Sequence, residues 1–187
     1  MNFVEPIRDK AKLHMIEDWL YMYGEKYYVM FEIGIYSGLR VSDILPLRKE
    51  DVWHKTHIKI REKKTGKYKM FVINPELSSV LDPYAKGLRP GDLLIPSNPK
   101  FPKEKPVSTS MAYKVLRRAG EECHLPGLGT HSMRKTFGYH YYRRYKDVAE
   151  LMRLFNHSSP SITLRYIGIE QDGLDKHMKG FSLKGYD

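Results

Sequence analysis

Two kinds of hydrophobic spacing divide this chain, and together they predict a mostly α-helical domain with one small antiparallel β-sheet (α+β). Through most of the sequence, apolar residues recur three or four positions apart, which is the spacing of one face of a helix. Between residues 56 and 73 the period changes, because Ile58 and Ile60 alternate with cations and a second run rich in β-formers follows. A basic turn containing Gly66 separates the two runs. This segment therefore predicts a β-hairpin with a basic tip.

Local end signals set the bounds of the other elements. Asp147 and Glu150 have the spacing of a capping box, and Ser159 followed by Pro160 is an N-cap and first-turn pair. Prolines and lysines at 96–106 indicate an exposed loop. The predicted helices lie at 9–22, 25–37, a short stretch from Ser42, 76–86, 109–122, from a Thr130 cap to Arg144, from Asp147 to Phe155 and from Ser159 to Tyr166, with a short strand at 92–95.

Charge and cysteine content narrow the class of protein. Lys and Arg outnumber Asp and Glu by 32 to 22, a net charge of +10 that favours a polyanionic partner, with nucleic acid ahead of a membrane surface. A single cysteine, Cys123, excludes an intrachain disulfide and a CxxC zinc site. No apolar run is long enough to span a membrane, and acidic residues interrupt any signal-like start. We expect a single domain of 187 residues working in the cytoplasm.

Several side chains suited to binding a phosphate occur in separate parts of the chain. His131 and Arg134 lie three apart in the first turn of a predicted helix, so they share a face where free backbone N–H groups also favour an anion. Arg40 lies at a junction between helices, and Lys64 lies at the hairpin tip. Each of these is common by itself, as is a tyrosine such as Tyr166 in a chain with 14 of them.

Taken in order, these residues resemble the catalytic signature of the tyrosine recombinases, the phage integrase family. The resemblance covers about residues 10–168. Its motifs are Ser37-Gly38-Leu39-Arg40 with Asp43, Lys64-Thr65-Gly66, His131-Ser132-Met133-Arg134, Asn156-His157-Ser158-Ser159 and Thr163-Leu164-Arg165-Tyr166.

The resemblance implies the fold of a tyrosine-recombinase catalytic domain and a site-specific recombinase activity. In that family a tyrosine attacks a DNA phosphodiester, forms a 3′-phosphotyrosine link and releases a 5′-hydroxyl. A 5′-hydroxyl from a partner strand then reverses the step. Because the covalent link stores the bond energy, neither metal nor ATP is required. The expected roles are nucleophile for Tyr166, transition-state clamp for Arg40 and Arg134, general acid for Lys64, base or hydrogen-bonding partner for His131, and phosphate ligand for His157.

One position departs from the family pattern. Members usually have Gly before the histidine of the third motif, whereas this chain has Asn156. That residue follows the predicted helix opened at Asp147, where left-handed backbone geometry is expected. Asn is the best tolerated residue there after Gly, so we expect the change to be accommodated.

The resemblance also implies a duplex DNA partner and assembly on it. Expected DNA contacts are Lys63, Lys67, Lys114, Arg117 and Arg118, with the loop at 100–105. Members usually carry an N-terminal domain that closes around DNA; we expect that domain to be absent here, as in an excised fragment or in the short fimbrial-switch invertases. We expect a homotetramer on DNA and a monomer or weak oligomer without it. The tail at 169–187, with Ile169, Leu174, Met178 and Phe181, either docks on a neighbouring protomer or packs on its own domain.

Three other functions compete with this one. A non-catalytic DNA-binding or regulatory protein on the same fold would have no reason to keep Tyr166 together with both arginines. A metal-dependent nuclease needs converging carboxylates or Cys/His ligand spacing, which the sequence does not display. A type IB topoisomerase shares the phosphotyrosine chemistry but relaxes supercoils without a partner strand.

Overall fold

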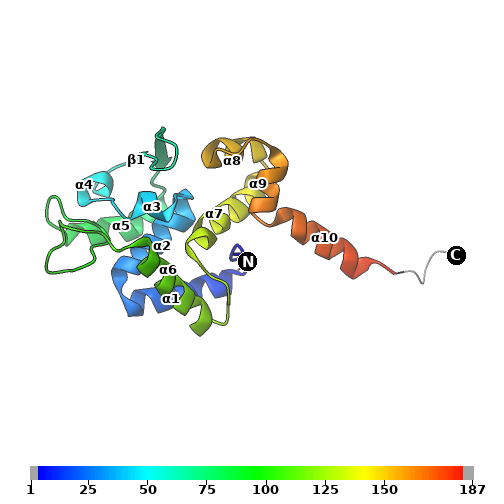
Figure 1. Cartoon of the computed structure of the whole chain (residues 1–187), viewed down its shortest axis with the longest axis horizontal. Coiled ribbons are helices and arrows are strands. Elements are labelled where there is room, and N and C mark those ends of the chain that lie inside the picture. The colour runs from blue at the N-terminus through cyan, green and yellow to red at the C-terminus, as the bar shows by residue number, and fades with distance from the viewer. Residues whose placement is uncertain (1–3, 183–187) are drawn as a thin grey trace.

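A computed structural model describes residues 4–182 and consists mostly of helices with one two-stranded antiparallel sheet, as predicted; the sheet lies at the edge of the molecule (Figure 1). In chain order the elements are α1 (Lys10–Tyr23), α2 (Glu25–Ser37), α3 (Val41–Ile44), α4 (Lys49–Val52), β1 (His57–Arg61), β2 (Tyr68–Val72), α5 (Pro75–Lys86), α6 (Thr109–Glu122), α7 (Thr130–Tyr145), α8 (Val148–Phe155), α9 (Pro160–Tyr166) and α10 (Ile169–Gly180).

Helix α2 is the centre of the main hydrophobic core. It packs against α1, α3, α5 and α7, and its apolar side chains are almost completely buried. At Gly34 a Cβ would lie 2.7 Å from the side chain of Met133 on α7, so only glycine allows the two helices to cross this closely. This crossing sets the distance between the end of α2 and the start of α7, where candidate catalytic residues lie.

Gly38 ends α2 in a way that only glycine permits. Its φ of 66° is left-handed, and its N–H donates to the Gly34 carbonyl at 3.0 Å. A Cβ at this position would also lie 2.5 Å from the ring of Phe137 on α7. The chain therefore turns sharply after α2 and delivers Arg40 to the N-terminus of α3.

A second, smaller hydrophobic core lies beneath α8 and α9. Its fully buried members are Leu151, Phe155 and Ile167, with Tyr166 packed against them. Helix α7 contributes side chains to both cores, because Met133 belongs to the main cluster and Phe137 to the smaller one. The molecule therefore has a main body and an α8–α9 unit, joined along α7.

The predicted end signals of this unit are confirmed. The side chain of Asp147 accepts a hydrogen bond from the Glu150 N–H at 2.9 Å, and Ser159 caps α9 ahead of Pro160. Asn156 adopts left-handed geometry, with φ 56° and ψ 45°, at the end of α8. The sequence rules for helix ends were sufficient here because each depends on neighbouring residues alone.

Three expectations about secondary structure were wrong or incomplete. Gly129, not Thr130, is the N-cap of α7, and its N–H donates to Ser132 Oγ at 3.1 Å. Residues 92–95 form no strand; this stretch has only isolated bridges, Arg48 with Leu93 and Pro96 with Pro106. The short helix α4 and the tail helix α10 were not predicted as helices.

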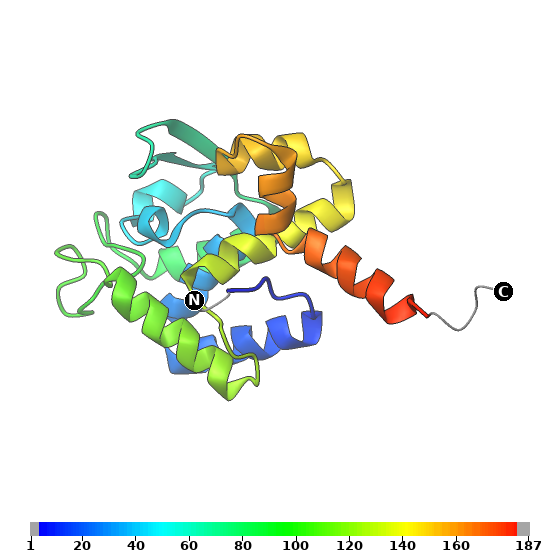
Figure 2. The same ribbon diagram turned by 45° about the vertical axis from the view of Figure 1, so that its right-hand side comes forward.

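Helix α10 extends away from the rest of the molecule (Figures 1 and 2). None of its residues is buried, and Leu174, Met178 and the adjoining Phe181 are each more than half exposed. Its first turn is held by Arg8, whose Nε donates to Asp172 Oδ1 at 2.8 Å. Residues 183–187 of the predicted tail lie outside the described part of the chain. Among the described residues, no helix combines the length and apolarity that crossing a bilayer requires.

Glu32 is an unusual member of the main core. It is 4% exposed, and its Oε1 has no hydrogen-bond partner among residues 4–182. Burial, together with the negative charge of Glu17 on α1, raises the pKa of Glu32 to about 8. At neutral pH the folded protein therefore binds a proton here that the unfolded chain does not.

We expect Glu32→Gln to stabilise the protein increasingly as pH rises. Because the folded pKa is raised, the wild type loses stability between the unfolded pKa, near 4.5, and about 8. The variant's advantage in free energy of unfolding grows by at most about 1.4 kcal/mol per pH unit across that window. Urea unfolding at pH 4, 6 and 8 measures this difference in free energy of unfolding, and Glu122→Gln, at an exposed position, is the control. Parallel pH profiles for Glu32→Gln and wild type would contradict it.

Candidate active site

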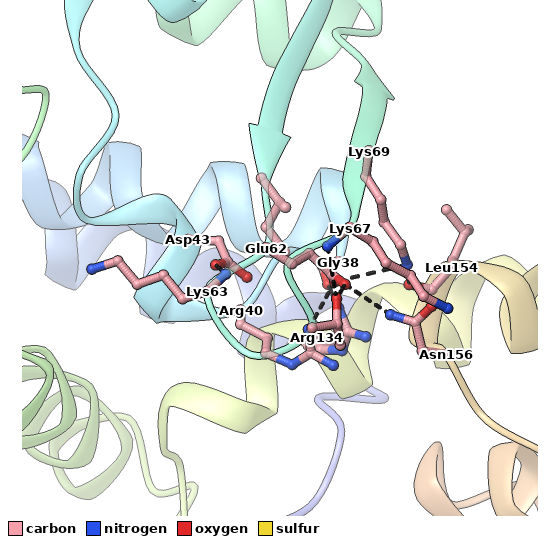
Figure 3. A network of polar contacts seen from close by, with 12 residues as sticks. Gly38, Arg40, Asp43, Glu62, Lys63, Lys67, Lys69, Arg134, Leu154 and Asn156 are labelled. Atoms are coloured by element: carbon pink, nitrogen blue, oxygen red, sulfur yellow. Dashed lines mark hydrogen bonds and ion pairs between the residues drawn. The ribbon is translucent and has the colours of Figure 1, made fainter.

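Five of the six candidate catalytic residues gather between the main body and the α8–α9 unit. Arg40 comes from the α2–α3 junction, His131 and Arg134 from the first turns of α7, His157 from the loop after α8, and Tyr166 from the end of α9. Figure 3 shows the guanidinium groups of Arg40 and Arg134 side by side beneath Glu62. Residues separated by up to 126 positions therefore form one centre.

Glu62, directly after β1, organises this centre and was not predicted from the sequence. It is 1% exposed. Its Oε1 accepts a hydrogen bond from Arg40 Nη1 at 2.7 Å, and its Oε2 accepts from Thr65 Oγ1 at 2.6 Å and Asn156 Nδ2 at 2.8 Å. Lys69 Nζ lies 3.7 Å from Oε1. Burial raises the pKa of Glu62, but the Thr65 hydroxyl and the charges of Lys69 and Arg40 outweigh it, so the pKa lies below its ordinary value.

Arg134 is buried against both parts of the molecule. Its Nη1 donates to the Gly38 carbonyl, and its guanidinium lies 4.2 Å from the centre of the Phe155 ring. Its Nη2 is buried and has no hydrogen-bond partner among the described residues. Burial, opposed by the hydroxyl of Tyr166, lowers the pKa of Arg134 to about 10, so it remains a cation at neutral pH. The NH2 group at Nη2 of this fixed, charged donor is thus left for an external acceptor.

Tyr166 and His131 face each other across the site. The tyrosine hydroxyl lies 3.5 Å from His131 Nδ1. Burial lowers the pKa of His131, and the charges of Arg134 and Lys135 lower it further. Burial also raises the pKa of Tyr166, while Arg134 and Arg40 oppose this. The free protein therefore holds a neutral phenol beside a neutral imidazole, the protonation states that a nucleophile and its base need.

His157 is fixed in the loop between α8 and α9. Its Nδ1 lies 3.0 Å from Thr163 Oγ1, and its ring packs edge-on against Tyr166 with centroids 5.2 Å apart. Burial lowers the pKa of His157, and the charges of Arg134 and Arg40 act in the same direction. With Nδ1 engaged by Thr163, Nε2 is the ring nitrogen left for a ligand.

Lys64 is the member that the structure does not bring into the centre. It is exposed at the hairpin tip and makes no hydrogen bond to any residue in 4–182. Its charge nevertheless acts on His131, whose pKa it helps to lower. The base of the tip is held firmly, because the Lys63 N–H donates to Asp43 Oδ1 at 3.0 Å. In Figure 3 the side chain of Lys63 points away from the two arginines.

A groove of about 610 Å³ lies between the hairpin tip and α8, directly beside the centre. It carries two cations, Lys67 and Arg153, next to His157. Its full lining is Lys67, Ala149, Met152, Arg153, Asn156, His157 and Ser158. A polyanion lying in this groove would reach the catalytic residues.

The other candidate DNA contacts lie on α6. Lys114 is exposed there. Arg117 pairs with Glu121 at 3.0 Å, and Arg118 lies over the rings of Trp19 and Tyr23 on α1, at 6.0 and 5.7 Å from their centroids. Both pairings leave the cations at the surface, where they can exchange partners at small cost. Between residues 4 and 182, no group of three or more His, Cys, Asp or Glu side chains is arranged to hold a metal ion.

The sequence matches proteins of one family along nearly its whole length. The model of the phage integrase family matches residues 13–172. The chain is 44% identical over 172 residues to the probable integrase/recombinase YoeC of Bacillus subtilis (strain 168), covering 92% of this chain and 93% of that protein. It is 26% identical to a tyrosine recombinase of Pseudothermotoga lettingae, covering 93% of this chain and 64% of that protein.

Solved structures show the same fold. The crystal structure of XerA recombinase aligns with a TM-score of 0.72 at 18% identity, over 94% of this chain and 63% of that one. A post-cleavage complex of the XerH site-specific recombinase with its difH substrate aligns with a TM-score of 0.69 at 19% identity, over 95% and 53%. A lambda integrase dimer bound to a core site aligns with a TM-score of 0.66 at 18% identity, over 87% of this chain and 47% of that one. The chain belongs to the phage integrase family, the tyrosine-type site-specific recombinases.

Proposed function

We propose that this protein cleaves and rejoins duplex DNA with Tyr166 as the nucleophile. The observation that carries the proposal is the unpartnered, buried Nη2 of Arg134, which lies beside Arg40 in a centre that Tyr166 and two neutral histidines complete. Two guanidinium groups suit the non-bridging oxygens of a phosphodiester, because they offer forked, charged donors where negative charge develops.

The proposed step moves one proton at each end of the reacting bond. Tyr166 Oη attacks phosphorus and gives its proton to His131 Nδ1, while the P–O5′ bond breaks. The leaving 5′-oxygen takes a proton from Lys64, brought in by the hairpin tip. His157 binds a non-bridging oxygen through Nε2. A 5′-hydroxyl of a partner strand then attacks the phosphotyrosine and restores the phenol.

The exposed position of Lys64 is compatible with this role. A tip that carries Gly66 and rests on Asp43 at its base can bend toward a bound strand. Lys67 and Arg153 in the adjoining groove would hold the neighbouring backbone. Lys63, Lys114, Arg117 and Arg118 would add phosphate contacts elsewhere on the duplex, making binding strongly dependent on salt.

The tail helix supports a proposal about assembly. An α10 with exposed apolar residues that projects from the domain suits docking on a neighbouring protomer better than packing on its own domain. The lambda integrase structure is a dimer on DNA. We extend this to a tetramer of four copies holding two duplexes, at work on chromosomal or mobile DNA in the bacterial cytoplasm.

The first prediction is a covalent adduct that depends on Tyr166. Incubation with supercoiled or nicked DNA in EDTA, followed by a detergent quench, traps labelled DNA on the protein. Tyr166→Phe abolishes the adduct because it removes the attacking oxygen. Tyr145→Phe, an exposed tyrosine on α7, is the matched control and retains it. Salt-sensitive binding without an adduct would instead favour a non-catalytic DNA-binding protein.

A second prediction isolates the role of Lys64. Lys64→Ala slows adduct formation by about 10²- to 10⁴-fold, the usual contribution of a general acid. A substrate with sulfur in place of the bridging 5′-oxygen restores the rate, since a thiolate leaves without a proton. Lys63→Ala and Lys67→Ala provide the comparison and show no such rescue. If the sulfur substrate instead restores the rate of Lys63→Ala or Lys67→Ala, the general acid is that lysine and not Lys64.

A third prediction concerns the two histidines in the free protein. NMR titration places the pKa values of His131 and His157 below the ordinary value of about 6.5. The charge of Arg40 contributes to both shifts, so Arg40→Gln is expected to raise both pKa values toward the ordinary histidine value. The glutamine still has an N–H to donate to Glu62. Titration of either imidazole at or above 6.5 in the wild type would contradict the geometry described above.

A further inference from the structure

We propose that Glu62 and Asn156 form a positioning link that aligns the two halves of the active site. The inference rests on the proposed function and assigns work to two residues outside the six catalytic side chains. Its basis is the hydrogen bond from Asn156 Nδ2 to Glu62 Oε2, 2.8 Å long, which joins the hairpin of the main body to the end of α8 (Figure 3).

The link matters because catalysis requires groups from both halves. Arg40 and the Lys64 hairpin belong to the main body, whereas His157 and Tyr166 belong to the α8–α9 unit. The two units have separate hydrophobic cores, and helix packing joins them chiefly along α7. Leu154 of α8 also packs against the main core, and polar contacts between the hairpin and the end of α8 add to this apolar one.

A second contact reinforces the first across the same gap. Lys69 on β2 donates to the carbonyls of Arg153 and Leu154, the last of these at the end of α8, and its Nζ lies 3.7 Å from Glu62. Charged donors at a helix C-terminus complement the helix dipole. Glu62 thus accepts from Arg40 with one oxygen and from Asn156 with the other, so a shift of either half is transmitted to the other.

The departure from the family pattern at Asn156 acquires a function in this arrangement. Left-handed geometry alone is better served by Gly, which has no Cβ penalty. A side chain that merely tolerates the position should therefore be replaceable by Gly without loss. A side chain that holds the His157 loop to Glu62 should not.

Asn156→Gly separates these two explanations, because only the positioning role predicts slower adduct formation. Positioning predicts that single-turnover adduct formation at saturating protein falls by about 10- to 100-fold, the usual effect of losing an outer-shell partner, while the melting temperature stays the same or rises. Lys146→Gly is the matched control: Lys146 is the left-handed end residue of α7, with φ 58°, and it precedes α8, whereas Asn156 follows that helix. Its rate of adduct formation is expected to equal that of the wild type.

Glu62→Gln tests the link from the other side. It slows the same step, and the double variant Glu62→Gln/Asn156→Gly is no slower than the slower single variant, because both changes break one connection. Additive losses would show that Asn156 acts elsewhere, for instance on DNA itself, and would overturn the link.

A DNA-free measurement keeps the test independent of the proposed function. Amide hydrogen exchange at His157 and Ser158 is expected to accelerate in Asn156→Gly and Glu62→Gln alike, and to stay at the wild-type rate in Lys146→Gly. Unchanged exchange in both linked variants overturns the inference even if the wild type forms no adduct. If the wild type forms the adduct and Asn156→Gly forms it at the same rate, the inference is overturned and the proposed function stands.

Discussion

Two guanidinium groups that repel each other must be held side by side in this protein, and a buried carboxylate makes that arrangement possible. Arg134 has lost most of its water, and the charge of Arg40 further disfavours its protonated form. Glu62 compensates both, through a hydrogen bond to Arg40 and a favourable field at Arg134. Removing such a partner leaves buried charge without compensation, which is among the costliest changes in a folded protein.

Burial, reinforced by the same cluster of cations, lowers the pKa values of the neighbouring histidines. Positive charges and burial together keep His131 and His157 neutral, while burial keeps the proton on Tyr166. Tyr166 is therefore a neutral phenol in the free protein. A bound anion would raise the pKa of His131 and so favour proton uptake by that imidazole.

Sequence patterns correctly predicted the features that depend on residues adjacent in the chain, such as helix ends. They failed for features that depend on contacts between distant parts of the chain. The ends of α8 and α9 follow from capping rules, and the left-handed geometry of Asn156 follows from its place after α8. Residues 92–95 have strand-like composition, yet a strand needs a continuous partner, and only isolated bridges are available there. Helix α10 has apolar residues at irregular intervals: Ile169 packs on the smaller core, whereas Leu174 and Met178 are more than half exposed.

Glu62 escaped prediction for the same reason. In the sequence it is one acidic residue among the cations of a hairpin tip, which is typical of a solvated turn. Its burial is created by Asn156, 94 positions later in the chain, and by Arg40, 22 positions earlier. The only sequence signal was indirect: Asn156 occupies a position where Gly is usual, and a polar side chain at such a site calls for a partner.

Arg134 connects these observations, because it belongs to both halves of the fold. On one side it donates to the carbonyl of Gly38, where a Cβ would lie 2.5 Å from the ring of Phe137, and on the other it lies over Phe155 of the smaller core. A side chain held this way has little freedom to lose when substrate binds, so its remaining N–H is preorganised for a phosphate oxygen. Arg134 thus contacts both halves of the fold and places its Nη2 at the point where they meet.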